Sequence, residues 1–152
     1  MSTLTQFVGI GTSLTVTNLT ACLKLTVCTA TPLGSRPKGT GGFLIARGGS
    51  NLWIVAPKCT EVSRNWGSRN DASTLAETCT SFSGWFVPEI SQLYNPGYLC
   101  RTYWDSFTPG RYWSNTLYFI TYGCYFNFST GVADRVCTFG TNCVRAFRCV
   151  TY

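Results

Sequence analysis

The last third of the chain, residues 110–152, carries the most regular alternation of hydrophobic and polar positions. Two interleaved sets of side chains alternate along residues 123–128: Cys124, Phe126 and Phe128 with Gly123, Tyr125 and Asn127. A period of two predicts a strand with one buried face. Residues 129–131 supply turn residues, and the aromatic and β-branched segment 144–150 predicts a second strand. We therefore expect a small antiparallel sheet that ends the domain.

Two short apolar segments, 43–46 and 52–56, flank the sequence GGSN at 48–51, which predicts a β-hairpin. Asp71 or Ser73 could begin a short helix that continues to residue 79. The segment around Glu61 could form another helical turn.

A further helix is expected at 88–94, where Pro88 suits the first turn. Ile90, Leu93 and Tyr94 have the i, i+3, i+4 spacing of side chains that face one core. The sequence Asn-Pro-Gly at 95–97 should end this helix. Residues 98–111 then resemble a loop or short strand rich in aromatic residues.

Residues 1–39 differ in composition, because Thr, Ser and Gly alternate there with Leu, Val and Ile. Period two around 14–16 and 23–27 predicts two strands, and the prolines and glycines at 32–39 predict a linker. Two such strands cannot bury their apolar faces alone. We therefore expect a β-rich arm at 1–39 that pairs with the domain at 40–152, with copies of itself, or with a larger assembly.

The composition favours short strands and many turns, because only 12% of residues are charged while 15% are aromatic. The net charge is +6, and the basic residues are scattered singly, so no nucleic-acid motif is present. This charge indicates a mildly basic solvated surface or, alternatively, attraction to an acidic one. No apolar run spans a membrane, and the start of the chain lacks the features of a signal peptide.

Nine cysteines are unusual for a chain without an export signal, and they suggest an oxidising final environment. Their odd number leaves at least one thiol unpaired within a chain. Cys137 and Cys143 could meet across a hairpin if residues 139–142 form a turn; the alternative is that the cysteines are free and buried, acting as small apolar residues. A metal site is not expected, because the chain has no histidine and no Cys-x2-Cys pair.

The sequence also lacks a recognisable catalytic set. Without histidine, the Ser-His-Asp and Cys-His arrangements cannot form. The six carboxylates are spread thinly, and no pair is marked by spacing as an acid and a base. No phosphate-binding loop or calcium loop is present. We therefore expect no catalytic residue, cofactor or metal.

Four short motifs occur in an order that resembles the DUF1566 domains, including the carboxy-terminal domain of the Legionella collagen-like adhesin. They are WFVP at 85–88, YWS at 112–114, FSTG at 128–131 and VRAFR at 144–148. Where such families have Leu-Pro-Thr, this chain has Val-Pro-Glu at 87–89. The resemblance covers residues 40–152. These domains are similar to the C-type-lectin-like fold of formylglycine-generating enzymes and of phage receptor-binding proteins such as the Bordetella phage tropism determinant.

The resemblance implies an α+β, C-type-lectin-like domain with two short helices against a twisted antiparallel sheet. It implies a binding module whose ligand face is built from loops of the carboxy-terminal half, with Trp85, Trp113 and Arg145 as framework residues. Exposed aromatic and amide side chains suit such a face. Six residues are candidate contacts for a host-surface ligand: Tyr103, Trp104, Asn115, Tyr118, Tyr125 and Asn127.

The leading hypothesis is a non-enzymatic bacteriophage virion protein: a fibre, tail-tip or capsid-decorating subunit. Its expected partners are other virion proteins through residues 1–39, copies of itself, and a host-surface glycan or protein, with no nucleic acid and no membrane insertion. The alternatives are a secreted or surface glycan-binding adhesin and a purely structural filament subunit. An oxidase that uses Cys143 or Cys149 is a further alternative, without other support in the sequence.

Overall fold

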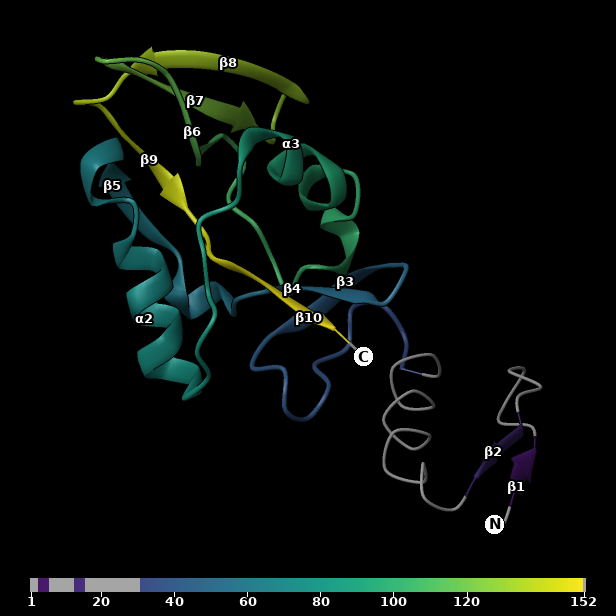
Figure 1. Ribbon diagram of the computed structural model, residues 1–152. Helices are drawn as coiled ribbons and strands as arrows, with labels where there is room; N and C mark the ends of the chain where they lie inside the picture. The colour runs from purple at the N-terminus through teal and green to yellow at the C-terminus, as the bar shows by residue number, and fades with distance from the viewer. Residues whose placement is uncertain (1–2, 6–12, 16–30, 152) are drawn as a thin grey trace.

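The computed structural model describes residues 3–5, 13–15 and 31–151, which form an α+β structure with main sheets of three and five strands (Figure 1). In the three-stranded sheet, β4 (Asn51–Val55) lies between β3 (Phe43–Gly48) and β10 (Phe147–Thr151), antiparallel to both. The predicted hairpin is thus confirmed as β3 and β4. In its turn Gly49 has a φ of 57°, a left-handed conformation that glycine adopts without steric cost.

The five-stranded sheet has the order β5 (Val62–Asn65), β9 (Thr141–Val144), β6 (Arg111–Phe119), β7 (Tyr122–Asn127) and β8 (Val132–Cys137). β7 and the turn that follows it confirm the strand and turn predicted from the alternation at 123–128. β6 and β9 run parallel, and the other neighbours are antiparallel. The expectation of one antiparallel sheet is therefore wrong, because two sheets form and one pair of strands is parallel.

The segment 144–150, which was predicted as one strand, instead contains the end of β9 and most of β10. β9 ends at Val144 in the five-stranded sheet, and β10 begins at Phe147 in the three-stranded sheet. Between them the chain crosses at Arg145 and Ala146, where the Ala146 carbonyl accepts a hydrogen bond of 2.9 Å from the Ala56 amide. The last two strands thereby join the two sheets, as Figure 1 shows.

Two short helices accompany the sheets. α2 (Asp71–Thr80) confirms the predicted helix, although Asn70 occupies the N-cap position. α3 (Ile90–Gln92) starts with a capping box between Glu89 and Gln92 and continues as the irregular helix η4 (Leu93–Tyr98).

The predicted helical turn around Glu61 is wrong. The turn, η2 (Lys58–Thr60), lies just before it, and β5 follows because Val62–Asn65 pairs with β9. Two more short 3-10 helices are η3 (Trp66–Ser68) and η5 (Arg101–Tyr103).

At the amino-terminal end, β1 (Thr3–Thr5) and β2 (Ser13–Thr15) form an antiparallel pair. The strand predicted at 23–27 lies outside the described residues. Further on, Gly34 and Ser35 exchange backbone hydrogen bonds of 2.8 and 2.9 Å with Leu44 of β3. Among the described residues, no helix has the length and apolarity needed to cross a bilayer.

The core consists of three hydrophobic clusters. The largest joins the two sheets and is rich in aromatic rings: Ile45, Val55, Leu93, Trp104, Tyr112, Phe126, Phe128 and Phe147. The ring of Trp104, for example, has the ring centroids of four other aromatic residues within 6.3 Å. Because this cluster draws on β3, β4, β6, β7 and β10, it fixes the relative position of the sheets.

Candidate binding surface

A buried polar network surrounds Arg145, whose side chain is fully buried. Its guanidinium donates hydrogen bonds to the carbonyl of Ala56 at 2.6 Å and to the carbonyl of Ser106 at 2.9 Å. It also forms ion pairs with the carboxylates of Glu61 and Asp105. One side chain therefore connects the start of the β9–β10 crossing with the end of β4 and with the loop before β6.

Glu61 is the other centre of this network. It accepts hydrogen bonds from the Lys58 ammonium, from the Thr108 hydroxyl and, at 2.6 Å, from the Tyr112 hydroxyl. Burial alone would raise the pKa of Glu61, but these hydrogen bonds outweigh it and hold the pKa below its ordinary value. Burial and the bond to Glu61 together raise the pKa of Tyr112.

The polar groups of this network bond to one another and to backbone carbonyls. Trp85, Trp113 and Arg145 are 5%, 0% and 1% exposed, which agrees with the framework role that the resemblance implies. The Trp113 ring nitrogen donates to the Arg64 carbonyl at 2.8 Å, across β9. The network therefore ties loops to sheets.

The six predicted contact residues do not gather in one place. Trp104 and Tyr125 are 6% and 7% exposed and belong to two of the core clusters. Asn115 accepts a bond from Arg69 and donates one to Glu89, both at 2.9 Å.

Asn127 holds the turn after β7, because its side-chain oxygen accepts a bond of 2.9 Å from the Ser129 amide. These four side chains therefore serve the fold. Tyr103 and Tyr118 are exposed, at 38% and 57%, on different parts of the molecule.

Tyr103 is one of five exposed residues of η4 and η5, which we together call the helical face: Tyr94, Asn95, Leu99, Thr102 and Tyr103. The three apolar members are 46%, 49% and 38% exposed. Sequence reasoning missed Tyr94, since its spacing from Ile90 predicted a core position. The adjacent Asn-Pro-Gly, which interrupts the helix at Asn95, was the available signal.

Tyr118 belongs to a second exposed surface, which we call the sheet tip: Leu117, Tyr118, Phe119, Ile120, Tyr122 and Phe139. The first five residues form the end of the β6–β7 hairpin, and Phe139 lies in the turn between β8 and β9. Only Tyr118 was predicted from the sequence. The unbroken apolar run at 117–120, without a glycine or proline before the turn, was a signal for the rest.

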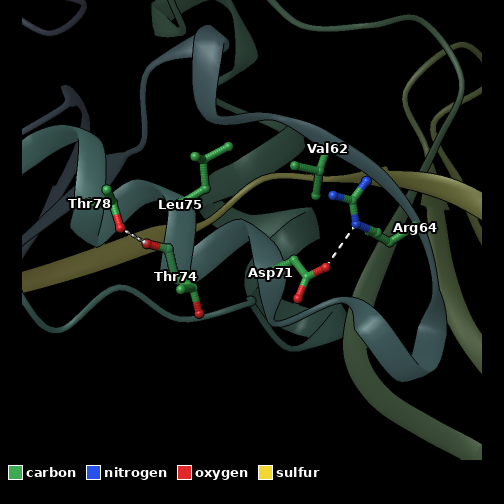
Figure 2. Close-up of a pocket in the computed structure, with 6 residues that line it drawn as sticks. All are labelled: Val62, Arg64, Asp71, Thr74, Leu75 and Thr78. Carbon is green, nitrogen blue, oxygen red and sulfur yellow. Dashed lines mark hydrogen bonds and ion pairs between the residues drawn. The ribbon is translucent and has the colours of Figure 1, made fainter.

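A shallow groove of about 230 Å³ lies between β5 and α2 (Figure 2). Val62 and Leu75 supply apolar side chains. At one end the Arg64 side chain pairs with Asp71 at 2.8 Å. At the other the Thr78 hydroxyl donates to the Thr74 carbonyl at 3.0 Å. These hydrogen-bonding groups thus already have partners within the groove, which makes it a weaker candidate than the two exposed surfaces.

The seven cysteines in the described part of the chain are free thiols. The predicted meeting of Cys137 and Cys143 is wrong, because β6 and β7 separate their strands. Burial raises the pKa of Cys143, which favours the thiol over the reactive thiolate. Within the described residues no cluster of metal-ligating side chains occurs.

Comparison with protein-family models gives no match, and comparison with curated proteins gives none either. The likeness to C-type-lectin-like domains therefore rests on the sequence motifs.

Proposed function

We propose that this protein is a non-enzymatic structural subunit of a bacteriophage virion. In this proposal residues 40–152 form a C-type-lectin-like domain that is displayed outward for binding to a host-surface glycan or protein. Residues 1–39 attach it to other virion proteins.

The helical face is the observation that carries the proposal of binding. Tyr94 and Tyr103 supply exposed aromatic area with few rotatable bonds, and Asn95 and Thr102 supply hydrogen-bonding groups beside them. This combination suits a recognition surface, because rigid aromatic contacts lose little conformational entropy on binding.

The residues beneath the helical face are packed closely against the core. Leu93, Pro96 and Gly97 of η4 are buried beneath the exposed residues. A side chain at position 97 would meet the Phe147 ring at 3.1 Å, so the backbone here lies directly against the core. The Arg101 guanidinium stacks on the Tyr98 ring at 3.9 Å and donates to the Tyr98 carbonyl. A surface held in this way is ready to bind without rearrangement.

Binding to host cells tests the ligand face. We expect Tyr94→Ala and Tyr103→Ala each to weaken binding of the purified, fluorescently labelled protein about tenfold, as for central aromatic contacts. Tyr118→Ala is the control, since it removes an even more exposed tyrosine, at 57%, from the sheet tip. Equal losses for all three variants, or no loss for any of them, would overturn the assignment to the helical face.

Particle composition tests the location. Quantitative mass spectrometry of purified particles from the source should find the chain in a fixed stoichiometric ratio to the major capsid protein. Its presence in culture supernatant without particles would instead support the secreted adhesin. Stoichiometric copies without any host binding would support the purely structural filament subunit.

A further inference from the structure

The sheet tip exposes large apolar side chains to an unusual degree. Its members are between 45% and 81% exposed, with Ile120 at 81% and Phe139 at 80%. Ile120 lies in the β6–β7 turn and Phe139 in the β8–β9 turn, and these two turns are neighbours. The Thr138 amide donates a hydrogen bond of 2.9 Å to the Thr121 carbonyl, which joins the β8–β9 turn to the β6–β7 turn. Figure 1 shows both turns at the same end of the five-stranded sheet.

The residues that make up the tip are themselves uncharged. No charged residue occurs in 116–122 or in 138–143. One neighbouring cation is Arg135, which lies over the Tyr118 ring at 4.0 Å and follows Asp134 in the chain. Depletion of charge together with enrichment in tyrosine and phenylalanine is typical of the centre of a protein–protein interface.

The area of the tip is that of one side of an ordinary interface. With about 200 Å² for each large apolar side chain, the exposed fractions of its six members amount to about 750 Å². The largest apolar patch on a typical monomer is about 300–600 Å², and a stable complex buries about 800 Å² on each partner. The Leu117–Gly123 and Phe119–Tyr122 pairs lie on opposite faces of the hairpin end, so two tips in contact would bury a part of this area, which is that of a small interface.

We propose that the sheet tip is a self-association surface and that its occupant is the same tip of a second copy. An apolar patch is complementary to itself, which a two-fold symmetric contact requires. The chain carries a net charge of +6, so copies repel one another wherever their charged surfaces meet. Ile120 and Phe139, the most exposed members of the tip, carry no charge, so a contact centred on them keeps Arg135, which covers Tyr118, towards its rim.

The exposed edge strand β8 is less suited to this role. Symmetric antiparallel pairing centred on the middle of β8 would place Asp134 opposite its own copy, or Arg135 opposite its own copy. Like charges directly opposite each other destabilise a strand pair. The tip contact needs no strand pairing, and it stands independently of the ligand proposed for the helical face.

The test is sedimentation equilibrium of the full chain between about 1 and 100 μM, for the wild type and for the double variant Ile120→Ser/Phe139→Ser. Both side chains are more than three-quarters exposed, so the fold should tolerate their loss. We expect the variant to raise the dissociation constant of the tip contact about 100-fold or more, since each change acts twice in a symmetric contact. Val132→Ser is the matched control: it removes a residue that is 56% exposed at the other end of β8 and should change nothing.

Residues 1–39 could also join copies, so hydrogen–deuterium exchange at 117–122 and 138–141 provides a local readout. We expect these amides to become more protected as the wild-type concentration rises, and the double variant to lose this effect. Concentration-independent exchange in the wild type, or association unchanged in the variant, would overturn the proposal. Binding of a monomeric wild type to phosphatidylglycerol vesicles that the double variant fails to bind would overturn it in favour of a lipid surface.

Discussion

Replacing Arg145 with methionine should be among the most destabilising single changes in this domain. Methionine keeps much of the side-chain volume but leaves Glu61 and Asp105 without their shared cation, and two backbone carbonyls without their donor. Removing one partner of a buried ion pair costs about 3–5 kcal/mol. The Asp105 side chain is 22% exposed and can be hydrated, and Glu61 keeps its bonds from Lys58 and Tyr112. We therefore expect the lower end of the range, about 3 kcal/mol.

The assay is equilibrium unfolding in urea at pH 7, with the slope compared between variants to confirm that the unfolded state is unchanged. Arg148→Met is the matched control. Its guanidinium also donates to backbone carbonyls, of Ser83, Gly39 and Thr40, but forms no ion pair with a carboxylate among the described residues, so we expect a loss of about 1 kcal/mol.

A double-mutant cycle sharpens the test of Arg145. Adding Glu61→Gln to Arg145→Met removes one of the two carboxylates that have lost their shared cation, so the double variant should be less destabilised than the sum of the single changes. A loss below about 1 kcal/mol for Arg145→Met would show that the network does not stabilise the fold. Strict additivity in the cycle would show that Glu61 and Arg145 act independently.

Three further outcomes follow from the same structure. The pKa of Glu61 is lowered in the folded state, so its ionised form stabilises the fold above the unfolded-state pKa of about 4.5, and this stabilisation is lost as the pH falls. In urea titrations, Glu61→Gln should therefore reduce the decrease in the free energy of unfolding between about pH 5 and pH 3. In Gly42→Ala the new Cβ would lie 2.2 Å from the Val55 carbonyl oxygen, so we expect a loss of about 1–3 kcal/mol in the same unfolding assay, whereas Gly48→Ala has open space and should change little. In timed alkylation of the native protein, read by peptide mass, Cys143 should react more slowly than the two cysteines that are exposed on helical segments: Cys59 and Cys79.

Local signals in the sequence were sufficient for the elements that neighbouring residues determine. The hairpin of β3 and β4 follows from the GGSN turn, β7 from its period of two, and α2 from its start near Asp71. In each case the pattern and the turn residues lie within about ten positions of each other.

The elements that were predicted wrongly are those whose structure depends on contacts between residues far apart in the sequence. The break at Arg145 depends on Asp105, 40 residues away, and on Glu61, 84 residues away. The sequence around this arginine does not indicate that it will be buried, because the same Val-Arg-Ala-Phe sequence also fits one continuous strand.

The sequence predicted that aromatic side chains would form a candidate binding surface, but it did not predict which of them are exposed. Trp104 and Tyr118 are both aromatic residues between turn signals, yet one lies in the core and the other is 57% exposed. Aromatic side chains suit either place, so only the packing of β6 and β7 against the rest distinguishes them.

The crossing between β9 and β10 affects the order in which the two sheets can fold during synthesis. β9 sits between β5 and β6, and β10 sits beside β4, so residues 141–151 complete both sheets. During synthesis all earlier strands leave the ribosome before the segment that links them. The nascent polypeptide must therefore keep its aromatic cluster from premature aggregation until this closing segment emerges, and the two sheets then assemble together as one cooperative unit.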